Sequence, residues 1–147
     1  MASPLIFAKK CDIILLYNIG GDRMHKNYLL VYSEQLATEI ELMCQHLKVS
    51  SNTLFQIRKS SSSVYANIRE ANYGQSMADM LSKFEIALKE CSETEGWLQL
   101  LYNTHGIDEI TFKKQRNLCG RIRRMLISSC RTLKDKLSRY NYETVQK

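Results

Sequence analysis

The stretch SSSSVYANIREA, residues 60–71, decides the fold, because four consecutive serines form either a linker or part of a helix. It contains no Pro or Gly. Small or apolar residues continue through it at alternating spacings of three and four: Leu54, Ile57, Ser61, Val64, Ile68 and Ala71. A linker has no reason to keep this phase, so the pattern predicts one continuous helix.

Serine is a mediocre helix former, so tertiary packing must hold this predicted helix. We therefore expect Ser61 and Ala71 to lie where a neighbouring backbone comes close. The alternative is a solvated serine loop that separates two shorter helices. Asn72, Tyr73 and Gly74 indicate a helix stop, with Gly74 in the left-handed conformation.

Three further segments show helical periodicity. The first covers residues 27–47, and its apolar set is Leu29, Tyr32, Leu36, Ile40, Met43 and Leu47.

The next predicted helix is expected to begin at Ser76 as N-cap, with Asp79 three residues on. Its buried set is Met80, Phe84, Ala87, Cys91, Thr94, Leu98 and Leu101. Asp108 is expected to cap the last helix, whose set is Phe112, Cys119, Ile122, Leu126, Leu133 and Leu137.

Four amphipathic helices joined by short loops predict an all-α, antiparallel, up-down-up-down four-helix bundle with crossing angles of about 20°. The expected organisation is an N-terminal extension of uncertain structure over residues 1–24, the bundle over 25–140 and a flexible C-terminal tail over 141–147. The apolar run IILLYN in the extension is a short strand or helix in this interpretation. It is too short to span a membrane.

The cysteines and the net charge restrict the cellular setting. Five cysteines, an odd number without a C-x-x-C pair, indicate neither a disulfide framework nor a zinc knuckle. Cys91 and Cys119 fall on apolar faces and are expected in the core. A reducing cytoplasm fits this usage best. The net charge of +6 in 147 residues favours polyanionic partners.

The basic charge is concentrated in the last predicted helix. Ten Lys and Arg residues lie between Lys113 and Arg139, with Asp135 as the single acid. On a helical wheel they lie opposite or beside the apolar set, along a face roughly 40 Å long. Because pairing within the helix is almost absent, we expect an anionic partner, either nucleic acid or an acidic protein surface. The alternative is an ordinary solvated face.

The candidate nucleic-acid or partner-binding residues are Lys113, Lys114, Arg116, Arg121, Arg124, Arg131, Lys134 and Arg139. Arginine predominates among them, which suits bidentate contacts to phosphate. Tyr140 and Tyr142 could stack on bases.

No set of residues indicates catalysis. The sequence has no phosphate loop, H-E-x-x-H or nucleophile elbow, and its His residues lack the Glu-x-x-His spacing of di-iron bundles. Glu93 and Glu95 are two residues apart and point to different helix faces. Glu95, near the apolar stripe, is expected to be a structural partner of a buried Arg or Ser. We therefore predict no enzyme activity, no cofactor and no metal.

The two central segments together resemble the bacterial four-helix bundle protein family. The matching pattern is S-x-x-A-N-I-x-E-(A/G) followed by I-A-x-x-x-x-x-E-x-E-x-x-L, over about residues 28 to 137. The motif residues, structural in this interpretation, are Ser63, Ala66, Asn67, Ile68, Glu70, Ala71, Ile86, Ala87, Glu93, Glu95 and Leu98. The serine-rich lead-in and Cys91 depart from the family pattern.

That family includes proteins encoded in intervening sequences of large ribosomal RNA and is similar to the accessory variability proteins of diversity-generating retroelements. The resemblance implies a homopentameric ring and, for retroelement members, a basic surface for nucleic acid and a reverse transcriptase.

Three functions follow as hypotheses. The first is a non-enzymatic oligomeric adaptor that binds RNA or complementary DNA and a reverse transcriptase. The second is an intervening-sequence-type protein that acts as a protein or rRNA interaction module. The third is a bundle that binds a small molecule or metal, although it lacks inward His and acid pairs.

Overall fold

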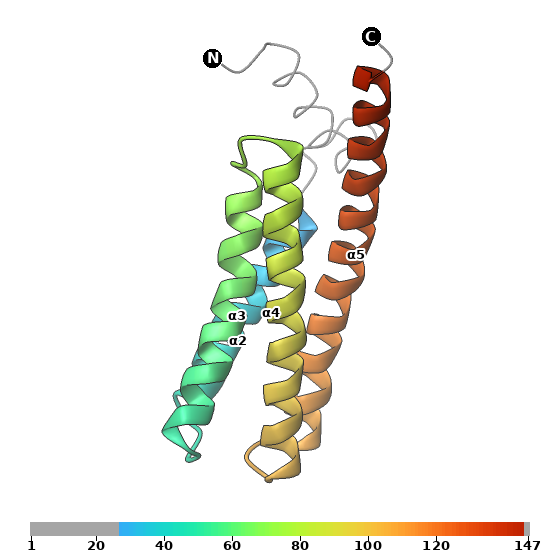
Figure 1. Cartoon of the computed structure of the whole chain (residues 1–147). Helices are drawn as coiled ribbons and strands as arrows, with labels where there is room; N and C mark the ends of the chain where they lie inside the picture. The colour runs from blue at the N-terminus through green and yellow to red at the C-terminus, as the bar shows by residue number, and fades with distance from the viewer. Residues whose placement is uncertain (1–26, 146–147) are drawn as a thin grey trace.

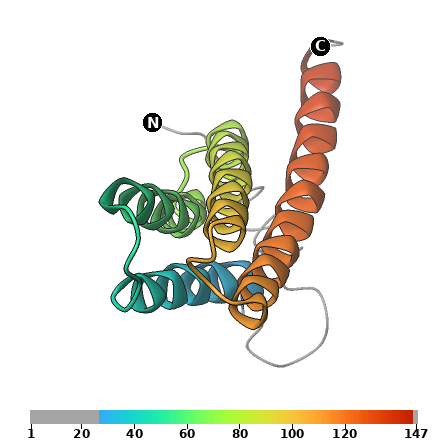
Figure 2. The same ribbon diagram turned by 90° about the horizontal axis from the view of Figure 1, so that it is seen from below.

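The computed structural model describes residues 27–145, which form four helices. Helix α2 spans Tyr28–Cys44, α3 Ser51–Ala71, α4 Met77–Asn103 and α5 Glu109–Val145. Helices α2 and α4 each pack against both α3 and α5, so the four helices form a closed square in cross-section (Figures 1 and 2). The all-α four-helix bundle is thus confirmed. The predicted extension and its IILLYN run lie outside the described residues.

The serine tract is helical throughout. Helix α3 passes through it without a break, and Ser60 and Ser61 are each only 1% exposed. The hydroxyls of Ser60, Ser61 and Ser62 donate hydrogen bonds to the carbonyls three residues earlier, at 3.0–3.2 Å. Each hydroxyl is therefore satisfied within its own helix, which removes the cost of burying it. The continuous-helix prediction is confirmed and the serine-loop alternative is wrong.

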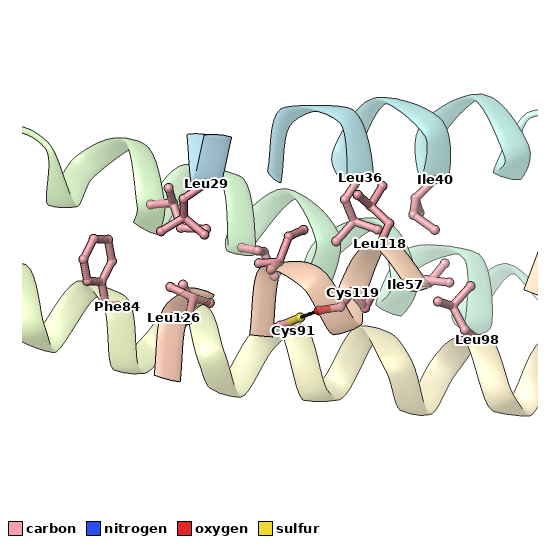
Figure 3. Close-up of a cluster of buried hydrophobic side chains, with 14 of the residues drawn as sticks. Leu29, Leu36, Ile40, Ile57, Phe84, Cys91, Leu98, Leu118, Cys119 and Leu126 are labelled. Carbon is pink, nitrogen blue, oxygen red and sulfur yellow. Dashed lines mark hydrogen bonds between the residues drawn. The ribbon is translucent and has the colours of Figure 1, made fainter. Parts of the chain in front are cut away.

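The core is built from the faces that the periodicity indicates. All seven residues expected on the inner face of α4 are buried. On α5 five of the six expected residues are buried, and Leu137 is half-buried. Figure 3 shows these side chains meeting those of α2 and α3, with the Cys91 thiol donating a 3.4 Å hydrogen bond to the Cys119 carbonyl. This bond joins α4 to α5 at the centre of the bundle.

Polar side chains cap the N-termini of α4 and α5 at the residues that the sequence predicts. The Asp79 amide donates to Ser76 Oγ at 3.1 Å, and the Asp79 carboxylate accepts from the Gln75 amide at 3.1 Å. This reciprocal pair closes the first turn of α4. The Thr111 amide donates to Asp108 Oδ1 at 2.7 Å, so Asp108 caps α5 as expected.

The left-handed residue lies elsewhere than predicted. Gly74 does not adopt the left-handed conformation, whereas His105, after α4, has φ of 59°. The amide of Gly106 donates to the Leu101 carbonyl at 2.7 Å, and the amide of His105 donates to the Tyr102 carbonyl at 3.1 Å. These two bonds form a Schellman motif with His105 in the position that glycine usually occupies.

Helix α5 is longer than its neighbours. Its last buried residue among those described is Leu133, yet the helix continues to Val145. Figure 1 shows its C-terminal end extending past the turn that joins α3 to α4. Residues 141–145 were predicted to belong to a flexible tail. They instead form the C-terminal end of α5.

Candidate nucleic-acid interface

The eight candidate binding residues are all exposed on α5. The apolar side of α5 faces α2 and α4, because its core residues recur at helical spacing and leave the opposite side to solvent. Along the centre of that outer side lie Lys113, Gly120, Arg124 and Arg131. Basic residues on the two flanks approach α2 or α4. Arg121 and Lys114 lie on the α2 side, and Lys134 lies on the α4 side.

Several of these cations carry a carboxylate partner in the same chain. Lys113 Nζ lies 2.6 Å from Glu109 one turn earlier, within α5. The flank cations pair with acids of neighbouring helices: Lys114 with Glu39 at 3.0 Å, Arg123 with Glu95 at 3.6 Å and Lys134 with Glu85 at 2.7 Å. Four of the ten basic residues thus have a carboxylate partner, but only Lys113 pairs within α5, so pairing within the helix is as sparse as expected. The wheel could not reveal three of these pairs, because their acids belong to α2 and α4.

Two arginines lie instead against aromatic rings. The Arg116 guanidinium is 5.6 Å from the centre of the Phe112 ring, and that of Arg121 is 6.0 Å from the Tyr32 ring. Such contacts hold a guanidinium in place while leaving its hydrogen-bond donors available.

The remaining cations have no partner within the part of the chain that the structure describes. Arg124, Arg131, Lys136 and Arg139 make no ion pair or ring contact there. Arg124 and Arg131 both lie on the central line of the outer side. Their positive charge is therefore uncompensated by the helix bundle.

A hollow opens in this basic face over Gly120. It has a volume of about 440 Å³, and its lining residues are Glu95, Lys113, Arg116, Asn117, Gly120, Arg121, Arg123 and Arg124. Five of the lining residues are cations and one is an anion. Gly120 is a functional candidate that the charge pattern alone does not indicate, and its only signal in the sequence is a glycine inside a basic helical segment.

Glu39 of α2 connects the basic helix to the bundle. Its carboxylate accepts hydrogen bonds from Gln35 at 2.9 Å and from the buried Gln115 at 2.6 Å, and it pairs with Lys114. Burial raises the pKa of Glu39, but these hydrogen bonds and the Lys114 charge together outweigh burial, so its pKa is lowered. Hydrogen bonding to Glu85 correspondingly raises the pKa of Lys134.

The family-motif residues have structural contacts. Ile68 and Leu98 are buried, while Ala66 is exposed. The Asn67 amide donates to the Ser63 carbonyl at 2.9 Å, and Glu70 pairs with Lys83 at 2.6 Å.

The two motif glutamates of α4 also have partners. The Trp97 indole donates to Glu93 at 3.5 Å, and Glu95 pairs with Arg123, which is 47% exposed rather than buried. The described residues hold no group of three or more potential metal ligands. No helix in the described range is both long and apolar enough to cross a bilayer.

The fold and this face define a four-helix bundle protein whose longest helix carries an outward line of cations. The family model described as 23S rRNA-intervening sequence protein matches residues 29–128, from the first turn of α2 well into α5. The chain belongs to this family. No curated protein matches it.

A solved structure supports the same assignment. It is the crystal structure of a protein of unknown function from the S23 ribosomal protein family of Bacteroides thetaiotaomicron. The two chains are 36% identical, with a TM-score of 0.66 over 69% of this chain and 97% of that chain. These two matches favour the intervening-sequence hypothesis over the retroelement one.

Proposed function

We propose that the protein is an RNA-binding module that acts without catalysis and contacts phosphates through the outer face of α5. The observation that carries the proposal is the position of Arg124 and Arg131 on the central line of that face, with no carboxylate partner among the described residues. Guanidinium groups bind phosphate oxygens through paired hydrogen bonds. They remain protonated at physiological pH, so they suit binding rather than proton transfer.

RNA is the first polyanion to test, because the family description names 23S rRNA. The proposal predicts binding that weakens steeply with salt, since each neutralised phosphate releases counterions. The test compares the wild-type protein with an Arg124→Glu/Arg131→Glu variant by fluorescence anisotropy on a single-stranded RNA at several salt concentrations. Loss of two phosphate contacts reduces the salt slope by about 1.4, at about 0.7 for each phosphate.

The matched control is Lys48→Glu/Lys89→Glu, which changes the net charge equally but at exposed positions in the loop after α2 and on α4. We expect the control to bind RNA nearly as the wild type does. If both variants bind equally well, or lose affinity equally, the α5 face is not the binding surface.

Self-association is a second part of the proposal. The family resemblance supports a homopentamer, and an apolar groove of about 620 Å³ between α2 and α3 offers a surface for it. Leu42 and Phe55 at this groove are 53% and 61% exposed. Light scattering on the purified protein measures the subunit number, and a persistent monomer would contradict this part.

The retroelement hypothesis is kept as an alternative partner assignment, with reverse transcriptase as the protein partner. Its test is the gene neighbourhood: a reverse transcriptase gene with template and variable repeats would favour it. A surrounding ribosomal RNA operon would favour the intervening-sequence assignment.

A further inference from the structure

The glycine beneath the basic hollow has no packing reason within the protomer. Glycine destabilises a helix interior relative to alanine, so a helical glycine usually marks a close approach. Close packing also explains Gly106, in the turn between α4 and α5, because a Cβ there would lie 3.0 Å from Val49 Cγ1. A Cβ at Gly120 would meet only the mobile end of Arg124, at an ordinary 3.5 Å. A side chain at residue 120 would therefore occupy the hollow without a clash with the rest of the bundle.

The lining of this space indicates the chemistry of its occupant. Lys113 and Arg123 are paired with Glu109 and Glu95, whereas Arg116 and Arg121 are held over aromatic rings. Arg124 has no ion-pair or ring partner among the described residues. Three guanidinium groups with available donors thus surround a hollow floored by backbone. An apolar helix from another protein would leave these charges desolvated and unpaired. A phosphate group accepts their hydrogen bonds directly.

We propose that the hollow over Gly120 is a phosphate subsite that holds a backbone phosphate of bound RNA against Arg116, Arg121 and Arg124. Gly120, itself buried beneath the surrounding side chains, leaves this space unfilled, so the phosphate contacts the arginine side chains around it. The volume of about 440 Å³ lies within the range of small-ligand pockets, so a nucleotide unit fits. This inference rests on the proposed RNA-binding function and assigns a specific position to one of its contacts.

The test fills the hollow without changing any charge. Gly120→Leu places an aliphatic side chain in the space, and Gly96→Leu is the matched control. Gly96 is also an interior helical glycine, and a Cβ there meets nothing within 4 Å. Leucine favours helix at both sites, so both variants are expected to fold, which circular dichroism and thermal melting verify. Binding of a single-stranded RNA is measured across salt concentrations for each full-length variant.

We expect Gly120→Leu to weaken RNA binding roughly tenfold and to lower the salt slope by about 0.7, which corresponds to one phosphate contact. Gly96→Leu is expected to bind RNA with wild-type affinity. The RNA affinity of Gly120→Ala is expected to lie between those of the wild type and Gly120→Leu. Wild-type affinity in a folded Gly120→Leu protein overturns the subsite. A changed oligomeric mass with unchanged RNA affinity also overturns it, because the hollow would then be a protein interface.

The Arg124→Glu/Arg131→Glu variant separates the two proposals. If that variant loses RNA affinity while Gly120→Leu keeps it, only the subsite fails. If the charge reversal itself has no effect, the proposed function fails as well.

Discussion

The Thr94 hydroxyl of α4 donates a 2.9 Å hydrogen bond to Ser60 Oγ of α3, at a point where both residues are essentially buried. The Ser60 hydroxyl in turn donates to the Ile57 carbonyl. A polar contact therefore joins two helices inside a largely apolar core. It fixes the first serine of the tract as a packing residue, because a larger side chain there would enter α4.

Ser60→Leu should therefore destabilise the protein by roughly 1–3 kcal/mol through overpacking. Ser62→Leu should change the stability by less than about 0.5 kcal/mol, because Ser62 is exposed two positions away on the same helix. Urea denaturation followed by circular dichroism measures both. Equal stabilities for the two variants would show that Ser60 does not contact α4 in this way.

The Glu39 contacts make stability depend on pH in the acid range. Its pKa in the folded protein lies below the ordinary value of 4.5, so its contribution is fully present above that value. The contribution is lost as the pH falls through the lowered pKa, because the protonated carboxyl no longer pairs with Lys114.

Glu39→Gln should therefore be less stable than the wild type at neutral pH, with a difference that shrinks in acid. Denaturation curves at a series of pH values measure this difference. Glu34→Gln, an exposed change on the same helix, serves as the control. A stability gap for Glu39→Gln that stays constant across the acid range would contradict the assignment.

The central cysteines should resist alkylation. A hydrogen bond with Cys91 and burial both raise the pKa of Cys119, which leaves almost no reactive thiolate. In the folded protein, iodoacetamide should label Cys119 far more slowly than in denaturant. Mass spectrometry of the peptide that contains residue 119 measures the rates, and fast labelling in the absence of denaturant would show that the core opens there.

The left-handed residue after α4 offers a stabilising substitution. His105 has φ of 59° and is exposed, so its side chain adds backbone strain without evident packing. His105→Gly should stabilise the protein by about 1 kcal/mol, since glycine adopts this conformation without a Cβ penalty. His105→Ala retains the Cβ and should give no such gain. Thermal melting of the two variants distinguishes relief of strain from loss of the imidazole.

The sequence predicts the bundle well because packing in it repeats at the helical period. The heptad phase through Ser61 and Val64 correctly indicates α3, and every residue expected inside α4 is buried. Helix ends were harder to predict, because Gly74 after α3 is not left-handed whereas His105 after α4 is, and a histidine carries only a modest preference for that conformation. The local signal of Gly74 favoured the wrong helix end.

The candidate interface was only half predictable. A wheel drawn for one helix places Arg124 and Arg131 outward, as the structure does. It contains no information about Glu39, Glu85 and Glu95, which belong to other helices and meet α5 only after folding. Charge compensation between helices therefore could not be predicted from α5 alone, although the position of Glu95 near the apolar stripe did indicate an Arg or Ser partner for it.

These neutralised flanks set the direction in which α5 can attract a polyanion. Carboxylates of α2 and α4 pair with Lys114 on one flank and with Arg123 and Lys134 on the other, while Arg124 and Arg131 on the central line have no such partner. Arg124 and Arg131 are seven residues apart, about 10 Å along that axis. A strand lying along α5 meets both, whereas one crossing it steeply meets a single guanidinium. The proposed RNA-binding function therefore predicts a strand that runs along α5 rather than across it.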